Sequence, residues 1–365
     1  MFSKKTSLIN FTLPQTICII AFYIQQLEMM NMTPPQSICI LRFSAIGDVC
    51  HAVAAVQAIQ RHYPSAKITW VIGKIEAMLV GDIPNVEFIT LDKKAGLSGY
   101  LSLYNQLKSR KFDILLNMQV SLRANISSLC IRATQRWGFD KYRAREGQWL
   151  VTNRRIPAQE KPHVLEGFMA FSEAIGVPKQ KPTWDIPISK EDSLWALSQI
   201  SHTKKNLIIC PAASKASKNW TATGYAEIAD YMETQGFQVT ICGGMSDLEK
   251  ELTAEIVKQS KANINNLVAK TTLKQLLAVI KNADLVLAPD TGPTHMSTTV
   301  GTPVVGLYAL HNPGRTGPYN NLNDVVEVYT KHMPNVKWGK RMKKENAMQE
   351  ITVHNVIKKL TPFLK

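Results

Sequence analysis

The sequence predicts an α/β fold made of two Rossmann-like, doubly wound domains that face each other across a cleft. Apolar runs of strand length alternate with longer segments of helical spacing. The alternation stops in a proline-rich zone and then starts again, and the 365 residues fit two domains of roughly 150 residues better than one. Because such sheets bind ligands at the carboxyl ends of their strands, the cleft is the expected binding site.

In the first half, strands are expected over 38–43, 68–72, 86–90 and 114–117, and helices over 49–62, 75–80 and 101–110. Pro64 closes the helix over 49–62. Five prolines then gather between positions 157 and 187, around a helix expected over 163–175. This proline-rich zone is the predicted boundary between the domains.

In the second half, strands are expected over 206–210, 238–242, 285–288 and 303–308, and helices over 224–235, 247–259, 273–281 and 294–300. A last helix is expected over about 350–364. We therefore divide the chain into domains over 35–185 and 186–340 and a C-terminal helical segment over 341–365.

Near the N-terminus, Lys4 and Lys5 precede a largely apolar stretch over 8–24. Polar residues and a proline interrupt the stretch, it is short for a spanning helix, and no small-residue cleavage site follows. We interpret residues 1–34 as an extension outside the fold. Two alternatives stay open: Met30 or Met32 is the true start, or the stretch is a weak membrane-surface anchor.

The charge of the chain points to an anionic partner. With 43 basic and 28 acidic residues, the net charge is +15, which suits a nucleic acid, a phosphorylated ligand or an acidic membrane surface. No RNA-binding signature, zinc finger or basic helix with heptads is found, so no nucleic-acid partner is expected. The six cysteines form no Cys-x-x-Cys pair, which favours buried thiols in a reducing, cytoplasmic compartment.

The first candidate loop, residues 42–51, directly follows the first strand. Ser44 and Gly47 allow a tight turn, and Asp48 falls at the start of the next helix. Two interpretations remain open: Asp48 caps the helix N-terminus, or its carboxylate faces the cleft as a general base.

The second loop, residues 211–220, follows the first strand of the second half. Small residues, Ser214 among them, allow close approach of a ligand to the backbone, and Lys215 or Lys218 can supply positive charge to a phosphate. The alternative is a solvated basic loop.

The third loop, residues 288–295, leads from a strand into a helix. Thr291, Gly292 and Thr294 can donate to an anion at the helix N-terminus, and His295 can add a hydrogen bond or charge. A capped turn is the alternative. The chain carries neither a Gly-x-Gly-x-x-Gly fingerprint here nor a Walker-type run, which argues against dinucleotide oxidoreductases and P-loop enzymes.

A metal site is not expected. No two aspartates stand two apart, and the eight histidines lack ligand spacing. If a diphosphate leaves during the reaction, a lysine and a helix dipole must stabilise its charge.

Together the three loops resemble glycosyltransferase family 9, the heptosyltransferases. The matching elements are Gly47-Asp48-Val49-Cys50-His51, Lys218-Asn219-Trp220 and Asp290-Thr291-Gly292-Pro293-Thr294-His295, and the likeness runs from about position 38 to 319. The segment 140–146 is similar to a basic loop of the heptosyltransferase I branch. The resemblance implies a GT-B fold and inverting, metal-independent transfer of heptose from ADP-L-glycero-D-manno-heptose to the Kdo or inner core of lipopolysaccharide, with no cofactor.

The resemblance also implies a role for each site residue. Asp48 would deprotonate the acceptor hydroxyl, and Asp290 would anchor its loop or contact the donor. The other donor-binding residues would be Ser214, Lys218, Thr291, Gly292, Thr294 and His295, and the acceptor-binding ones Gly47, Arg123, Arg143 and Arg145. Domain 35–185 would then bind the anionic acceptor and domain 186–340 the donor.

Several alternatives remain open. A transferase of the same fold can use another nucleotide sugar, a family member can be catalytically dead, and Arg123, Arg143 and Arg145 can be solvated surface residues. The basic run over 337–344 is either a solvated tail or a peripheral contact with the cytoplasmic face of the inner membrane.

Overall fold

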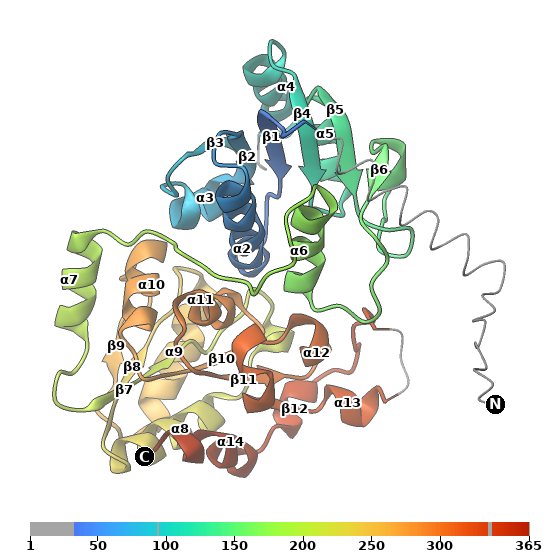
Figure 1. Cartoon of the computed structure of the whole chain (residues 1–365). Helices are drawn as coiled ribbons and strands as arrows, with labels where there is room; N and C mark the ends of the chain where they lie inside the picture. Colours follow the sequence, from blue (N-terminus) through green and yellow to red (C-terminus); the bar gives the residue numbers. More distant parts are fainter. Residues whose placement is uncertain (1–32, 93–94, 335–337, 365) are drawn as a thin grey trace, which may run out of the picture.

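The computed structural model describes residues 33–92, 95–334 and 338–364. The extension predicted over residues 1–34 lies almost wholly outside these ranges. The chain forms two domains, one above the other in Figure 1, each around a parallel six-stranded sheet. The strand orders are β3-β2-β1-β4-β5-β6 and β12-β11-β10-β7-β8-β9. Both have the Rossmann connectivity, so the predicted fold class is confirmed.

The N-terminal domain places helices on both faces of its sheet. Its strands are β1 (Ser37–Leu41), β2 (Lys67–Gly73), β3 (Val86–Leu91), β4 (Phe112–Asn117), β5 (Ala133–Gly138) and β6 (Arg154–Arg155), and its helices are α2 (Ile46–His62), α3 (Lys74–Val80), α4 (Gly96–Leu107), α5 (Leu122–Leu129) and α6 (Val164–Ala174). Because side chains alternate along a strand, Ile38 and Ile40 of β1 pack with α2 and α6, whereas Cys39 and Leu41 pack with α4 and α5.

The C-terminal domain repeats this plan. Its strands are β7 (Lys205–Ile209), β8 (Phe237–Ile241), β9 (Asn265–Asn266), β10 (Leu285–Pro289), β11 (Val304–Tyr308) and β12 (Val325–Glu327), and its helices are α7 (Lys190–Gln199), α8 (Ala222–Thr234), α9 (Asp247–Gln259), α10 (Leu273–Lys281), α11 (Gly292–Val300), α12 (Pro313–Thr316), α13 (Tyr329–His332) and α14 (Val353–Leu360). Trp220 fastens the C-terminal segment, since its indole N–H donates to the carbonyl of Ile351 at 2.8 Å.

The two domains share one apolar core. Side chains of α2 and α6 belong to the same buried cluster as those of α10 and α11. The linker runs along α2, where the Trp184 indole donates to the carbonyl of Cys50 at 2.8 Å and Gln57 exchanges two hydrogen bonds with the backbone of Asp185. The first turns of α2 and α11 therefore meet at the domain boundary (Figure 1).

The structure differs from the sequence expectations mainly in short elements. We did not predict α5, α7, α12, α13, β5, β6, β9 or β12. Helix α4 begins and ends earlier than expected, and the last helix covers only Val353–Leu360 before a short 3-10 turn. The five cysteines within the described ranges are free, and all but Cys130 are buried. No helix in those ranges combines the length and apolarity needed to cross a membrane.

Candidate active site

Asp48 lies in the first turn of α2, at the point where the chain leaves β1. Its carboxylate accepts a hydrogen bond from the Ala45 N–H at 3.4 Å and forms an ion pair with Arg42. The Asp48 side chain is still 35% exposed. The carboxylate thus interacts with its own helix terminus and remains accessible, so the two interpretations of Asp48 are compatible.

Arg42, which we did not predict from the sequence, forms an ion pair with the Asp48 carboxylate. The guanidinium is largely buried, donates to the carbonyl of Met118 at 2.8 Å and lies 5.1 Å from the centre of the Phe168 ring. Since these contacts fix its position, Arg42 determines where the Asp48 carboxylate points.

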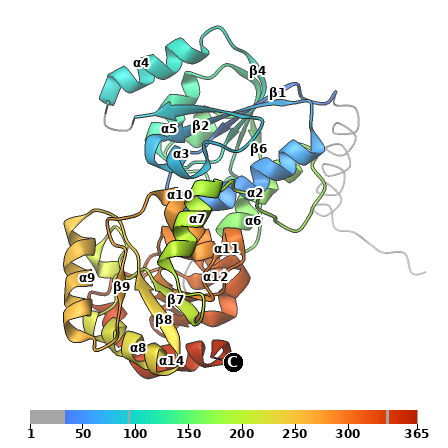
Figure 2. The same cartoon turned by 90° about the vertical axis from the view of Figure 1, so that its left-hand side faces the viewer.

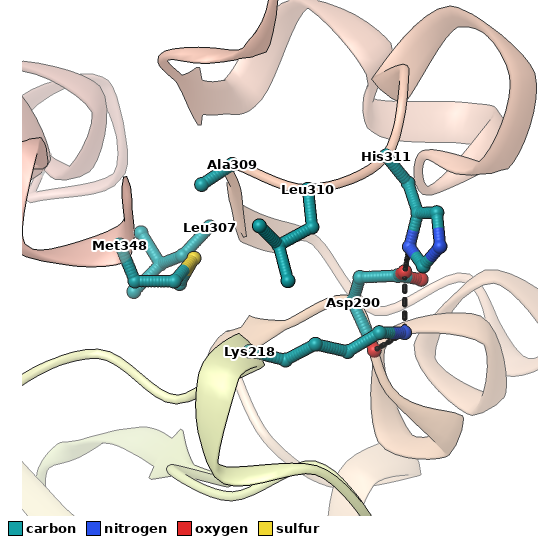
Figure 3. A pocket seen from close by; sticks show the side chains of 7 residues that line it. All are labelled: Lys218, Asp290, Leu307, Ala309, Leu310, His311 and Met348. Atoms are coloured by element: carbon teal, nitrogen blue, oxygen red, sulfur yellow. Dashed lines mark hydrogen bonds and ion pairs between the residues drawn. The ribbon is translucent and has the colours of Figure 1, made fainter. Parts of the chain in front are cut away.

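Asp290 is the centre of a second cluster, at the carboxyl end of β10. One carboxylate oxygen lies 2.7 Å from the Lys218 Nζ and 2.6 Å from the His311 Nδ1 (Figure 3). The other lies 3.8 Å from the His295 Nε2. Burial opposes ionisation, but His295, His311 and Lys218 together hold the pKa of Asp290 well below its usual value. Asp290 therefore stays ionised and ties three side chains together.

A small pocket adjoins this cluster (Figure 3). The pocket is partly open to solvent, and its lining is Lys218, Asp290, Leu307, Ala309, Leu310, His311 and Met348. The leucine, alanine and methionine side chains form an apolar wall, whereas the ionic groups lie at one end. Such a division suits a ligand with a flat apolar part next to a charged part.

The N-terminus of α11 lies beside Asp290. Thr291 is the N-cap residue and its side chain makes no capping hydrogen bond, Gly292 is the first helical residue, and Pro293 follows. The Thr294 hydroxyl is fully buried and donates to the carbonyl of Pro289 at 2.6 Å. The Thr294 hydroxyl therefore stabilises the turn, which leaves the backbone N–H groups and the Thr291 hydroxyl of this terminus to bind an anion.

The first and third loops meet across the domain boundary. A Cβ atom at Gly47 would lie 2.3 Å from the Cδ2 of His295, and one at Gly292 would lie 3.2 Å from the Cγ2 of Ile46. Only glycine fits at position 47, because real Cβ contacts are longer than this. The sequence motifs that contain Asp48 and Asp290 are thus brought together.

The predicted acceptor arginines behave differently from one another. Arg143 is engaged, since its guanidinium pairs with Asp140, donates to the Gln159 side chain at 2.9 Å and lies over the Phe139 ring. Arg123, in the first turn of α5, and Arg145 are exposed. Ser214, predicted on the donor side, is exposed just before a short 3-10 turn that contains Lys218.

Arg315, on α12, is a further basic residue that the sequence reasoning missed. Burial lowers the pKa of Arg315, while Asp48 and Asp290 raise it and Arg145 and Arg143 lower it. The Arg315 guanidinium therefore feels charges from both domains. A signal existed in the sequence, because residues 309–315 follow β11, the neighbour of β10, at the same edge of the sheet.

Three histidines form a buried cluster at the domain boundary. The ring centre of His51 lies 4.7 Å from that of His295 and 5.3 Å from that of His163. Neither nitrogen of His51 has a partner within the described part of the chain. Burial, together with His295, His163 and Arg42, holds the pKa of His51 well below its usual value. Burial thus keeps the imidazoles of His51 and His163 neutral where the domains meet.

Within the described ranges, no group of three or more His, Cys, Asp or Glu side chains is placed to hold a metal ion. Metal independence nevertheless remains a prediction.

One Rossmann-like domain brings a partly exposed carboxylate to the domain boundary, and the other brings an open helix terminus next to a lysine paired with a buried aspartate. This combination of fold and site defines a GT-B glycosyltransferase. Residues 100–346 match the sequence model of the family described as "Glycosyltransferase family 9 (heptosyltransferase)". The chain is 49% identical over 324 residues to the lipopolysaccharide core heptosyltransferase OpsX of Haemophilus influenzae, over 87% of this chain and 93% of OpsX. The chain therefore belongs to glycosyltransferase family 9.

Solved structures agree with this fold. The family 9 glycosyltransferase of Veillonella parvula DSM 2008 matches with a TM-score of 0.75 and 22% identity, over 90% of this chain and 97% of that one. Heptosyltransferase WaaC of E. coli, solved with ADP, matches with a TM-score of 0.72 and 18% identity, over 90% and 99% of the two chains. The prediction of family and enzyme class is confirmed.

Proposed function

We propose that this glycosyltransferase transfers L-glycero-D-manno-heptose from an ADP-heptose donor to the Kdo or inner-core sugar of lipopolysaccharide, with inversion at the anomeric carbon. The similarity to an enzyme named as a lipopolysaccharide core heptosyltransferase supports the substrate class. The observation that supports the mechanism is the contact between the first turns of α2 and α11, because the first of these turns carries Asp48 and the second directly follows Asp290.

The donor occupies the C-terminal domain in this proposal. The apolar wall of the pocket takes the adenine side of the nucleotide, and Lys218 and the N–H groups of Thr291 and Gly292 hold the diphosphate. Asp290 keeps Lys218 and His311 in place through its 2.7 and 2.6 Å contacts. Ser214 and His295 lie at the edge of the donor site, and Thr294 contributes through its backbone.

The chemical step joins the two domains. Asp48 accepts the proton of the acceptor hydroxyl while that oxygen forms a bond to the anomeric carbon. The bond from this carbon to the diphosphate oxygen breaks on the opposite face, and ADP leaves with the electron pair. Lys218 and the positive end of α11 stabilise the charge that develops on the diphosphate.

The acceptor is acidic, which suits the charges at the mouth of the site. In this proposal Arg145 and Arg315, which lie close enough for their charges to interact, contact a carboxylate of the acceptor near Asp48, and Arg123 extends the basic surface along α5. Gly47 leaves room for the close approach of acceptor and donor loops. Arg143 acts indirectly in this scheme, because its contacts with Asp140 and Gln159 fix the loop that carries Arg145.

The proposed reaction needs no metal ion, because Lys218 and a helix terminus take over the role that a divalent cation has elsewhere. Turnover with purified enzyme is expected to be unchanged by a chelator such as EDTA. Loss of activity that a divalent cation restores would contradict this part of the proposal.

The proposed place of action is the cytoplasmic face of the inner membrane, with no nucleic-acid partner. Of the basic run over 337–344, Lys337 lies outside the described ranges and Lys344 forms an ion pair of 2.5 Å with Glu350. This pairing leaves the run less suited to a membrane contact than its sequence suggests.

The substitution Asp48→Asn tests the general base. We expect turnover to fall by about 10²–10⁴-fold with donor affinity nearly unchanged, because the side chain keeps its size but cannot accept the proton. Asp247→Asn, an exposed carboxylate on α9, is the matched control. Equal turnover of wild type and Asp48→Asn would refute the role of Asp48, and a wild type without transfer would indicate a catalytically dead member.

A panel of nucleotide sugars tests the donor. ADP-heptose is expected to stabilise the protein against thermal unfolding and to give a product of the expected mass with a Kdo-containing acceptor. Preference for a UDP-sugar would assign the enzyme to another donor within the same fold.

A further inference from the structure

Two neighbouring helices of the N-terminal domain present apolar side chains to solvent. On α4 these are Leu97, Leu101 and Tyr104, and on α5 they are Leu122, Ile126 and Leu129. Both sets have the spacing i, i+4, i+7, so each lies on one face of its helix. The opposite faces of the same helices pack on the sheet through Leu103, Leu107 and Ala124. The exposed leucines are therefore not needed for this domain's core.

The two helices lie side by side. The Cys130 thiol at the end of α5 contacts the carbonyl of Tyr100 at 3.8 Å, and Arg132 donates to the carbonyl of Lys108 at 3.5 Å. The two helices thus contact each other on the side of the sheet opposite α2 and α6, and both turn apolar side chains to solvent. In Figure 2, α4 lies at the outer end of the upper domain, away from the C-terminal domain.

Three more exposed side chains extend this surface toward the site. They are Tyr142, Trp149 and Leu150, of which Tyr142 is 82% and Leu150 79% exposed. Glu146 ties their loop to α5, since it accepts hydrogen bonds from the Leu122 N–H at 2.8 Å and, through its backbone carbonyl, from the Asn125 side chain at 2.7 Å. We call these nine residues on α4, α5 and the 142–150 loop the apolar patch.

The patch lies in the most basic part of the N-terminal domain. Residues 95–155 contain eleven lysines and arginines and three acidic residues. Their net charge of +8 is more than half of the +15 of the whole chain. Each of the three acids is engaged: Asp113 accepts from backbone N–H groups, Asp140 pairs with Arg143, and Glu146 accepts from Leu122. Exposed leucines and an excess of positive charge thus occur in the same part of the domain.

We infer that the apolar patch docks on an anionic lipid bilayer, with its leucine and aromatic side chains in the interfacial layer and the surrounding lysines and arginines on lipid phosphates. This inference rests on the proposed function, because a lipid-linked acceptor lies at such a surface. Helices α4 and α5 start at the carboxyl ends of β3 and β4, the edge that also carries the Asp48 loop. Docking therefore brings the bilayer next to the acceptor arginines.

Other occupants fit the patch less well. A nucleic acid satisfies the positive charge but leaves the leucines without an apolar partner. A second copy of the chain covers the leucines but sets two strongly basic surfaces against each other. An anionic bilayer satisfies both features.

Vesicle sedimentation tests the inference with the full-length protein. Wild type is expected to bind vesicles that contain an anionic phospholipid and to bind zwitterionic vesicles at least tenfold more weakly. The double substitution Leu101→Ser and Leu129→Ser should weaken binding to the anionic vesicles at least tenfold. Lys108→Gln with Lys111→Gln should weaken it most at low salt. Leu194→Ser, an equally exposed leucine on α7, is the control and should bind as wild type.

Three controls separate the possible outcomes. Thermal unfolding of the variants should match wild type, because the altered side chains are exposed. Transfer to a delipidated, water-soluble acceptor should also be unchanged, so failure of the proposed reaction is seen separately from failure of docking. Wild type that does not bind anionic vesicles, or a leucine variant that binds as tightly, would overturn the inference. A dimer that the leucine variant dissociates would assign the patch to a second copy.

Discussion

The Asp290 carboxylate lies among side chains from three separate segments of the C-terminal domain. It holds Lys218 and His311 and lies near His295. The substitution Asp290→Asn keeps the shape but removes the charge that orients the lysine. We expect donor affinity to fall about tenfold and the free energy of unfolding to fall by about 1–3 kcal/mol. Donor titration and urea unfolding measure the two effects, and unchanged donor affinity would argue against a positioning role.

Arg42 acts on the site through Asp48. The substitution Arg42→Lys keeps the charge but cannot reproduce both the contact with Met118 and the ion pair. We expect kcat to fall about tenfold with KM for the donor unchanged. Arg110→Lys, which alters an exposed ion pair with Glu87, is the control. A change in KM alone would show that Arg42 serves binding and not the chemical step.

At the residue scale, the sequence predicted side chains that belong to short motifs. Asp48, Lys218, Asp290 and His295 stand in loops that follow strands, where the chain direction and the helix termini already suggest an anion site. The partners of these residues could not be found in the same way. Arg42 lies within the first loop, but only the tertiary structure shows that it is buried against Phe168 and Met118.

Helices α2 and α11 meet through a glycine. A Cβ at Gly47 would lie 2.3 Å from the His295 ring, so Gly47→Ala forces the two first turns apart. We expect a loss of about 1–3 kcal/mol in the free energy of unfolding and a lower kcat, because Asp48 moves away from the donor. Gly243→Ala, where a Cβ meets its neighbours at 3.4 Å or more, is the control. Equal stability of the two variants would show that the boundary adapts easily.

At the element scale, long periodic segments could be predicted and short ones could not. Helix α5 shows the reason clearly. Its buried residues include Ala124, Asn125, Ser127 and Ser128, while its leucines and isoleucine face solvent. Its apolar pattern therefore points away from the core, and serine and asparagine are weak helix formers. Similarly, β6 and β9 have two residues each and exist only because a neighbouring strand is in place.

At the scale of the whole molecule, the histidine cluster links stability to pH. Burial lowers the pKa of His163 from 6.5 to about 4. Between these values the unfolded chain binds a proton that the folded chain does not, so stability falls as pH falls from 6.5 to 4, by about 3 kcal/mol at most for this residue. Urea unfolding of wild type and His163→Gln at pH 7 and pH 5 measures the effect. The variant should lose less stability, whereas His202→Gln, an exposed histidine, should behave as wild type.

The overall arrangement of two doubly wound domains could be predicted, because the alternation of strands and helices restarts after the prolines. The way in which the two domains pack against each other could not be predicted from the sequence. The shared core depends on which faces of α2, α6, α10 and α11 remain apolar after each sheet is covered. The net charge indicated an anionic partner, but its concentration around α4 and α5 becomes meaningful only once those helices are seen side by side.

Two hydrogen bonds connect the segment before α6, in the N-terminal domain, to the C-terminal domain. His163 contacts the carbonyl of Gly317 at 2.9 Å, and the Trp338 indole donates to the carbonyl of Pro162 at 2.9 Å. Gly317 directly follows α12, which carries Arg315, and His163 caps α6, which packs on α2. If a bound nucleotide shifts the segment after β11, we expect α6 to move with it. Because α6 packs on α2, the position of Asp48 should then change as well. Amide exchange in α6 should slow when ADP binds. Binding of the nucleotide to the C-terminal domain would then change the stability of a helix in the N-terminal domain.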